Sequence, residues 1–377
     1  MQCGAVREIE HGSTLGYSSR MPHENGPKPR EVKLDPKVTD TGLSGEVREK
    51  LQSKIVNQQE AVDALMRAYE TFLLGFNPPN RPIRNLIFAG PTGTGKTLAS
   101  ESLAQVLFGD TRAVTKISCE EFQSPHEIAK LIGAPAGYVG HRETEAMLSQ
   151  SRIDKYQTVE TPLNIILFDE IEKADQALWN LLLGILDKGH LSLGSGGETD
   201  FTRSIIIMTT NRGAQEMDRI LSGKEIGFAG TSFTGTTLHQ IASKAVRGNF
   251  SPEFMNRIDE VVVFNALTRD DLRQIFSKEV ITIQDRIIKS QKCPLFVLRW
   301  TTDAIDHIIN RGTDSKSGAR ELKRVMEKLI VHPLSVLILS KQIRPDDIVT
   351  VDIEDGELVF LDDRAAAPLR MPLLEKT

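Results

Sequence analysis

Gly90-Pro91-Thr92-Gly93-Thr94-Gly95-Lys96-Thr97 is the most informative stretch of this 377-residue chain. A short apolar run from Asn85 to Ala89 precedes it, and a helical pattern from Leu98 to Leu107 follows it. Glycines at this spacing, closed by Lys-Thr between a strand and a helix, are the pattern of a phosphate-binding loop, or P-loop. A Gly-rich turn that arose by chance would not need this strand and helix around it. The stretch therefore predicts a binding site for the phosphates of ATP.

Each part of the predicted P-loop has a chemical task. Its glycines allow backbone N–H groups to curl around phosphates, and the helix that follows points its positive end at them. Lys96 is expected to reach the β and γ phosphates, and the Thr97 hydroxyl is expected to bind Mg²⁺. ATP and Mg²⁺ are therefore the predicted cofactors. The predicted cofactor-binding residues of the loop are Gly90, Pro91, Thr92, Gly93, Thr94, Gly95, Lys96 and Thr97.

Four more apolar runs have the same character as the run before the P-loop. They are continuous rather than alternating, and helical patterns separate them. Such runs are typical of parallel strands that are covered on both faces. The predicted fold is therefore α/β, with a doubly wound parallel sheet. The four runs are Val114–Ile117, Ile165–Phe168, Ser204–Met208 and Val261–Phe264.

A smaller, separate domain is expected after Leu267, where the pattern becomes mostly helical. Two amphipathic stretches, Leu272–Ile288 and Ala319–Ile338, precede two short strand candidates, although Pro333 should break or kink the second stretch. We therefore expect an α+β domain here. The full prediction is a disordered N-terminal tail at 1–40, a large nucleotide-binding domain at 41–267, a smaller C-terminal domain at 268–362 and a flexible tail at 363–377.

Two acidic residues, Asp169 and Glu170, close the apolar run that ends at Phe168. A carboxylate at the end of such a strand can lie near Mg²⁺, and a second one can polarise an attacking water. Taken alone, an acidic pair after an apolar run could equally begin a helix. Together with a complete P-loop upstream, the pair favours a catalytic site. We assign Asp169 to the metal and Glu170 to the general base.

Composition excludes several classes of protein. Lys+Arg 46 against Asp+Glu 51 gives a net charge of -5, which argues against a dedicated nucleic-acid binder. Cys3, Cys119 and Cys293 are odd in number and far apart, so they predict neither a disulfide framework nor a metal site. No apolar run approaches the ~20 residues of a membrane helix, and the first residues lack the apolar core of a signal peptide. These features predict a cytoplasmic protein that binds neither membranes nor nucleic acid.

The order of these motifs resembles the Clp-type AAA+ unfoldases, and most closely the second ATPase module of ClpB and ClpA. The resemblance covers about 50–355 and implies an AAA+ P-loop ATPase with a C-terminal small, or lid, domain. Domains and a second module found in full-length members are not in this sequence, so we expect a single-module, stand-alone form. The matching segments are Asn80-Arg81-Pro82-Ile83, Gly90 to Thr97, Gly133-Ala134-Pro135, Gly137-Tyr138-Val139-Gly140, Phe168 to Ala174, Met208-Thr209-Thr210-Asn211, Pro252 to Glu260 and Gly318-Ala319-Arg320.

The resemblance implies catalytic roles for Lys96, Glu170 and three further residues. Asn211 matches the sensor-1 position, where an amide helps to hold the attacking water. Arg257 matches the arginine finger, which would act on the nucleotide of a neighbouring subunit, and Arg320 matches sensor 2, which would contact the γ-phosphate of its own subunit.

The segment that contains Val56 matches the part of the family that lies near the adenine, so Val56 is a predicted cofactor-binding residue. The next residue, Asn57, replaces a glycine that the family usually has. Asparagine tolerates the left-handed backbone conformation better than most residues, so a backbone contact there could survive.

Two loops of the family bear on substrate. Tyr138 and Val139, between two glycines, match the loop that lines the central pore of a ring, although outside this family they would be read as a turn. Leu193 to Gly197 matches a second, weaker pore loop. The family forms hexameric rings, so the implied partners are further copies of this chain and an unfolded or aggregated polypeptide.

The leading functional hypothesis is an ATP-dependent unfoldase or remodelling chaperone that threads polypeptide through its pore. In a variant of it, Ile226-Gly227-Phe228 docks the ring onto a ClpP-type peptidase, although the same tripeptide could simply anchor its loop. A nucleic-acid motor is a second class, against which Tyr138 and the acidic net charge stand. A slow, nucleotide-controlled switch or scaffold is a third.

Overall fold

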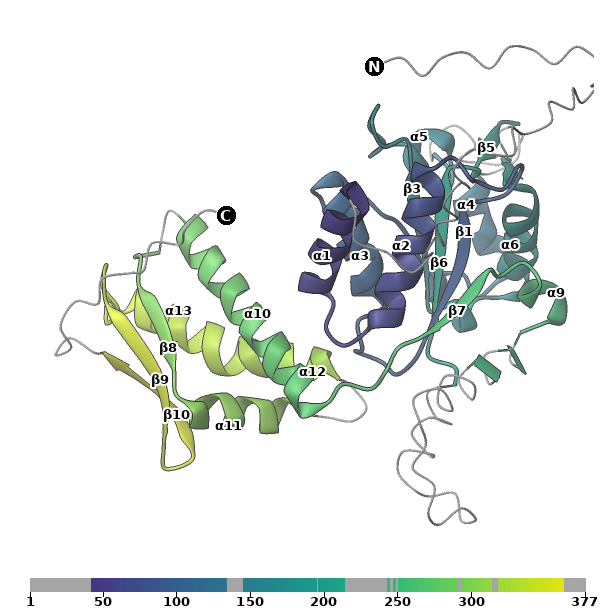
Figure 1. Cartoon of the computed structure of the whole chain (residues 1–377). Helices are drawn as coiled ribbons and strands as arrows, with labels where there is room; N and C mark the ends of the chain where they lie inside the picture. The colour runs from purple at the N-terminus through teal and green to yellow at the C-terminus, as the bar shows by residue number, and fades with distance from the viewer. Residues whose placement is uncertain are drawn as a thin grey trace, which may run out of the picture. The chain divides into compact units, whose positions relative to one another are not determined.

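A parallel sheet of five strands forms the centre of the chain in the computed structural model, in the order β2-β3-β6-β1-β7. All the paired strands run in the same direction, with Ile87 opposite Met208 and Ile117 opposite Phe168. The doubly wound α/β fold expected from the five apolar runs is confirmed (Figure 1). The strands are β1 (Arg84–Ala89), β2 (Thr115–Ser118), β3 (Asn164–Asp169), β6 (Ser204–Thr210) and β7 (Glu260–Val263).

The structure describes only part of the chain, and several predicted features lie outside it. Both predicted tails are outside, and so are Tyr138, Val139, Ser195 and Ile226-Gly227-Phe228. No helix within the described part is both long and apolar enough to cross a membrane. The described residues are 42–133, 145–194, 196–213, 243–244, 247–248, 250–290, 293–313 and 318–362.

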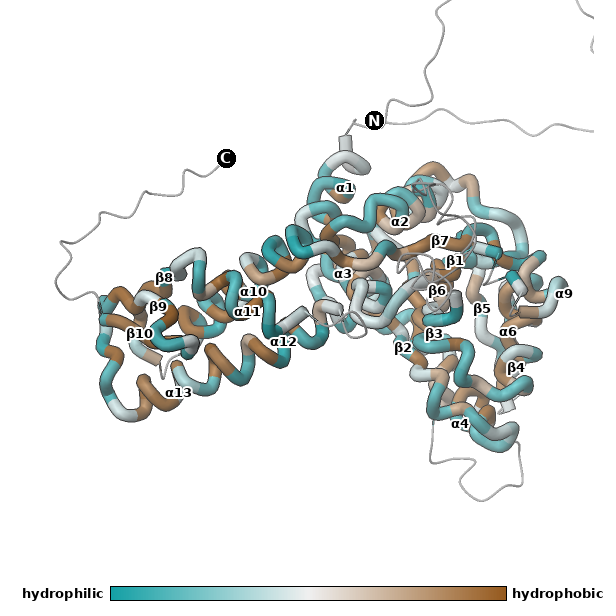
Figure 2. The backbone as a smooth tube through the Cα atoms, turned by 90° about the horizontal axis from the view of Figure 1, so that it is seen from below, coloured by the Kyte–Doolittle hydropathy of each residue, from teal (hydrophilic) through white to brown (hydrophobic). Residues whose placement is uncertain are grey.

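Helices cover both faces of the sheet, and successive strand residues alternate between them. Phe88 and Leu167 belong to the core beneath helices α1, α2 and α3, whereas Ile87 and Phe168 belong to the core beneath α6. Figure 2 shows β1, β6 and β7 as largely hydrophobic, which explains why these strands read as continuous apolar runs. The covering helices are α1 (Leu43–Lys54), α2 (Gln59–Leu73), α3 (Lys96–Phe108) and α6 (Gln176–Lys188).

Short elements fill the connections of the large domain, and the sequence patterns gave little sign of them. Helix α6 itself was not predicted, although Asp175 caps it by accepting a hydrogen bond from the backbone of Ala177. The short elements are η1 (Cys119–Glu121), η2 (Pro125–Ile128), α4 (Ala129–Ile132), α5 (Gln150–Ile153), η3 (Ile171–Lys173), β4 (His190–Ser192), β5 (Glu198–Asp200) and α9 (Pro252–Met255).

The residues after Leu267 build a core of their own from helices and a three-stranded sheet in the order β10-β9-β8. Strand β9 pairs parallel with β8 and antiparallel with β10. Pro333 does not break the predicted second helix. A π-helical stretch precedes the proline and accommodates it, and Pro333 lies in the first turn of the α-helix that follows. The elements are α10 (Arg269–Lys289), β8 (Val297–Trp300), α11 (Thr302–Gly312), α12 (Ala319–Met326), η4 (Glu327–Val331), α13 (His332–Leu339), β9 (Ile348–Glu354) and β10 (Glu357–Asp362).

A buried carboxylate ties the start of α10 to the loop before α2. Asp271 closes a capping box with Thr268, and the same Oδ2 atom accepts a hydrogen bond of 2.8 Å from Asn57 Nδ2. Asn57 has φ 55, the left-handed conformation that the sequence argument allowed for an asparagine in place of a glycine. The asparagine therefore adopts the left-handed conformation that this position requires, and it adds a side-chain hydrogen bond that a glycine could not make.

Replacing Asn57 should separate these two contributions. Asn57→Ala removes the donor to Asp271 and leaves a side chain at positive φ, so we expect a loss of about 1–2 kcal/mol in the free energy of unfolding. Asn57→Gly loses the same bond but relieves the backbone, so it should cost less. Urea denaturation measures both. Asn80→Ala is the matched control, because exposed Asn80 has φ 58 and makes no side-chain hydrogen bond to any described residue. Equal stability of Asn57→Ala and Asn80→Ala would contradict a role for the bond.

Candidate functional site

The P-loop connects the end of β1 to the start of α3, as predicted. Gly90 has φ 153, and a Cβ atom there would lie 2.6 Å from the backbone oxygen of Phe264, so only glycine fits. Within the loop, the Thr94 hydroxyl donates to the Pro91 carbonyl over 2.9 Å. Strand, turn and helix therefore hold the loop in the arrangement that binds phosphates in this type of site.

Lys96 is the most buried charged side chain of the site, at 7% exposure. Its ammonium donates to the carbonyl oxygens of Gly90 and Pro91, each over 2.8 Å, and to Asn211 Oδ1 over 2.9 Å. Burial lowers the pKa of Lys96 from 10.5 to about 8, although the nearby carboxylates of Glu172, Asp169 and Glu170 oppose this shift. An anion close to the ammonium would stabilise its charged form, and a nucleotide phosphate would be such an anion.

Asp169 ends β3 directly opposite the start of α3. The Thr97 hydroxyl lies 3.1 Å from Asp169 Oδ1, and the Thr209 hydroxyl donates to the same oxygen over 2.6 Å. Lys116 on β2 lies 3.3 Å from Asp169 Oδ2. A hydroxyl beside one carboxylate fits Mg²⁺, which is commonly held by one or two protein oxygens with phosphates and waters completing its shell.

Glu170 stands at the next position with φ 58, a strained conformation for a glutamate. Its backbone N–H donates to the Thr209 hydroxyl over 2.9 Å, which helps to hold that turn. Asn211 Nδ2 donates to Glu170 Oε1 over 3.3 Å, and Lys173 forms an ion pair with the other oxygen. The pKa of Lys173 is raised by its bonds to Glu170 and to Glu120.

A cavity of about 240 Å³ gathers the predicted phosphate-side groups. Lys96, Thr97, Asp169, Glu170, Asn211 and Arg320 all line it, so sequence positions 96 and 320 meet in space. Arg257 does not line it. Its side chain instead contacts the Glu253 carbonyl over 2.7 Å and the Asp187 carboxylate at 3.6 Å.

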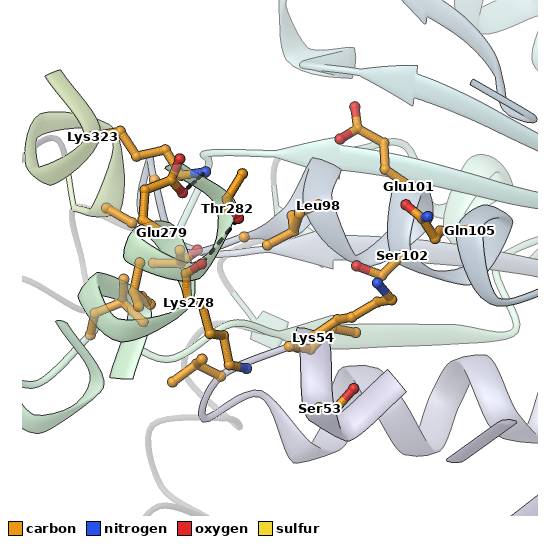
Figure 3. Close-up of a pocket in the computed structure, with 18 of the residues that line it drawn as sticks. Ser53, Lys54, Leu98, Glu101, Ser102, Gln105, Lys278, Glu279, Thr282 and Lys323 are labelled. Atoms are coloured by element: carbon orange, nitrogen blue, oxygen red, sulfur yellow. Dashed lines mark hydrogen bonds and ion pairs between the residues drawn. The ribbon is translucent and has the colours of Figure 1, made fainter. Parts of the chain in front are cut away.

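A second cavity, of about 390 Å³, continues from the first between the large and small domains (Figure 3). Val56 lines it, together with apolar side chains such as Ile275, so it has the character of a base-binding pocket. The two domains touch beside it, because Ala319 N donates to the Gly93 carbonyl over 3.2 Å. A Cβ atom on Gly318 would lie 2.9 Å from that carbonyl oxygen, so the close approach requires glycine.

Several side chains at these cavities were not predicted from the sequence. Lys116, Lys173, Glu279 and Lys323 come from separate elements, and no spacing pattern connects them with the P-loop. Thr209 could have been found, because a hydroxyl near the carboxyl end of β6 must lie beside the acids that end its neighbour β3.

The described residues of the predicted second pore loop lie in the turn between the paired strands β4 and β5. Leu193 N–H donates to the Gly197 carbonyl over 2.7 Å, which closes that turn. The principal pore-loop residues, Tyr138 and Val139, lie outside the described residues. Their role therefore stays a prediction.

Comparison with known proteins agrees with this geometry. A family model described as the AAA domain (Cdc48 subfamily) matches residues 81–261, and the C-terminal, D2-small domain of ClpB protein matches residues 267–351. The chain belongs to the Clp-type AAA+ family. The predicted family and fold are thus confirmed, including the likeness of the small domain to a second ATPase module.

Two curated relatives show the extent of the likeness. The ATP-dependent Clp protease ATP-binding subunit ClpC of Staphylococcus aureus (strain USA300) is 37% identical over 312 residues, which are 82% of this chain and 36% of that protein. Heat shock protein 104 of Schizosaccharomyces pombe is 34% identical over 308 residues, or 82% of this chain and 32% of that protein. The chain thus spans about a third of the length of these relatives.

Solved Hsp104 structures resemble the fold across both domains. One, a closed-state reconstruction of Hsp104 with ATPγS and FITC casein, has a TM-score of 0.71 at 28% identity and covers 85% of this chain and 51% of that one. An extended-conformation complex of Saccharomyces cerevisiae Hsp104 with casein has a TM-score of 0.72 at 30% identity and covers 84% and 52%. The resemblance therefore includes the arrangement of elements around the site.

The lowered pKa of Lys96 predicts a pH-dependent stability for this family member without nucleotide. Between about pH 8 and 10.5 the unfolded chain keeps a proton that the folded chain has released, so the free energy of unfolding should rise with pH. Measured against Lys96→Met, which lacks the titrating group, the rise should be on the order of 3 kcal/mol. Denaturant unfolding of both proteins at several pH values measures it. A difference that does not change with pH would show that burial does not shift the Lys96 pKa.

Proposed function

We propose that this chain is an ATP-hydrolysing motor that remodels polypeptides as a subunit of a ring. One observation carries the catalytic part of the proposal. Asn211 bonds Lys96 through its oxygen and Glu170 through its amide nitrogen, so one side chain joins the phosphate-binding lysine to the proposed base. A structural P-loop alone would not need that connection.

The chemistry assigned to each residue follows from its surroundings. Lys96 and the P-loop N–H groups hold the phosphates, while Glu170 takes a proton from the attacking water that Asn211 helps to orient. Mg²⁺, held by Thr97 and Asp169, would neutralise charge that builds up on the phosphate oxygens. Arg320 reaches the same cavity from the small domain and adds positive charge at the terminal phosphate.

Arg257 is proposed to complete the site of a neighbouring subunit. Its guanidinium contacts Glu253 and Asp187 and lines neither cavity of its own chain. An arginine acting across an interface must lie away from its own nucleotide, so this position supports action in trans. The active site would then be shared, and a homo-oligomer, most simply a hexamer, would be the active form.

Polypeptide is the proposed substrate. The Hsp104 structures that this chain resembles contain casein, and the chain has Tyr138 and Val139 at the family's pore-loop position. An aromatic side chain followed by a β-branched one can grip many sequences by apolar contact. The proposed site of action is cytoplasmic, where unfolded and aggregated chains arise.

A role as the unfoldase subunit of a ClpP-type protease is the second candidate. The relative named as a Clp protease ATP-binding subunit favours it, and Ile226-Gly227-Phe228 is the proposed docking segment. A nucleotide-controlled switch is the alternative that retains the site but not the motor activity.

ATPase rate against protein concentration, with and without casein, tests the motor. The rate per subunit should rise cooperatively as rings assemble and should rise again with casein, because substrate in the pore couples to turnover. Glu170→Gln is the control. It should bind ATP, but its rate of hydrolysis should fall by at least roughly 100-fold. A rate that responds neither to concentration nor to casein would leave a nucleotide switch in place of a motor.

Mixing two inactive variants tests whether the active site is shared. Lys96→Ala cannot hold ATP, and Arg257→Ala cannot donate the finger, so each should be inactive alone. In mixed rings some interfaces combine an intact Lys96 with an intact Arg257, and activity should return in part. Absence of any rescue, with mixed assembly verified by differently tagged subunits, would place Arg257 in its own active site or outside catalysis.

A further inference from the structure

The two cavities of the nucleotide site join at a short stretch of shared wall. P-loop backbone from Gly93 and Gly95, the side chains of Leu98 and Glu101, and two residues of α12 line both cavities. Of the two α12 residues, Ala319 is neutral and Lys323 is cationic. Among the described residues, Lys323 is therefore the cation that faces both the base-side and the phosphate-side cavity.

The lining of each cavity fixes the direction in which a nucleotide would lie. Val56 and Ile275 line only the base-side cavity, whereas Lys96, Asp169 and Arg320 line only the phosphate-side cavity. The shared wall thus corresponds to the part of a nucleotide between its base and its terminal phosphate. Helix α12 places Arg320 in the phosphate-side cavity. It places Lys323, one turn later, at the wall that both cavities share.

Lys323 has a partner within the small domain. Its ammonium lies 2.7 Å from Glu279 Oε2, and Figure 3 shows the pair on the wall of the cavity that α10 and α12 supply. Glu279 is 15% exposed, while Lys323 is 54% exposed and can move. Arg286 lies 3.6 Å from the same carboxylate. Glu279 therefore keeps a cationic neighbour if Lys323 turns toward a ligand.

We propose that Lys323 binds the phosphate nearest the sugar of the nucleotide, exchanging part of its contact with Glu279 for a charge-assisted hydrogen bond to a phosphate oxygen. The proposal rests on the proposed function, because it assumes that the joined cavities bind ATP and ADP. It assigns the two cations of α12 that line the cavities to different phosphates. Arg320 senses the terminal phosphate of ATP, whereas Lys323 contacts a phosphate that ATP and ADP share.

A purely indirect role for Lys323 predicts different behaviour. In that case Lys323 would only neutralise Glu279, and removing it would leave a carboxylate in the cavity that repels phosphates. Removing the Glu279 charge as well would then restore binding. If Lys323 contacts phosphate itself, binding stays weak when both are changed.

Isothermal titration of the full chain with MgADP and with MgATPγS tests the proposal. Lys323→Met should weaken both ligands by about tenfold, equal to ~1.4 kcal/mol, because each has the sugar-proximal phosphate. Lys323→Arg should retain most of the affinity. Arg324→Met is the matched control and should bind as the wild type does, since Arg324 pairs with Glu321 and lines neither cavity.

The effect of Lys323→Met is then measured again in the Glu279→Gln background. A similar loss there supports direct contact, whereas a loss that disappears overturns it. Unchanged ADP affinity in Lys323→Met, with normal thermal unfolding, also overturns the proposal while leaving the ATPase intact. If the wild-type chain binds neither nucleotide, the proposed function fails instead, which is a distinguishable result.

Discussion

The buried ammonium of Lys96 is the constraint on which the site depends. It donates hydrogen bonds to the oxygens of Gly90, Pro91 and Asn211. It therefore holds the P-loop backbone and the residue after β6 in fixed positions relative to each other. A buried cation is costly unless such oxygens surround it. The same bonds therefore fix the conformation of the P-loop, and they connect it to Asn211, which is proposed to orient the attacking water.

Strand order explains why residues distant in sequence meet around that ammonium. Because β3, β6 and β1 are neighbours in a parallel sheet, their carboxyl ends lie at one edge. Asp169 is the last residue of β3, Asn211 follows β6 and the P-loop follows β1. The sheet thus places Asp169, the Asn211 amide and the P-loop within hydrogen-bond reach of one another or of a shared neighbour.

The sequence was informative wherever a local pattern carried the structure. The five central strands are buried on both faces, so each appeared as a continuous apolar run, and the left-handed conformation of Asn57 is one that the tolerance of asparagine had left open. Strand β8 was missed because a short, half-buried strand gives a weak periodic signal, whereas helix α11 was missed although its buried Ala304 and Ile308 lie at helical spacing. The partners Lys116 and Lys323 were missed for another reason, since their positions depend on tertiary contacts that no spacing encodes.

The distribution of charged residues indicates that both domains contribute to the site. The large domain pairs its own acids, Asp169 with Lys116 and Glu170 with Lys173. Arg320 and Lys323 of α12 form no ion pair with these acids of the large domain, and they line the cavities because Gly318 lets α12 approach the P-loop carbonyls closely. A change of phosphate charge in the cavity must therefore change the energy of the contact between the domains. Under the proposed function, that linkage would couple nucleotide turnover to the position of the small domain.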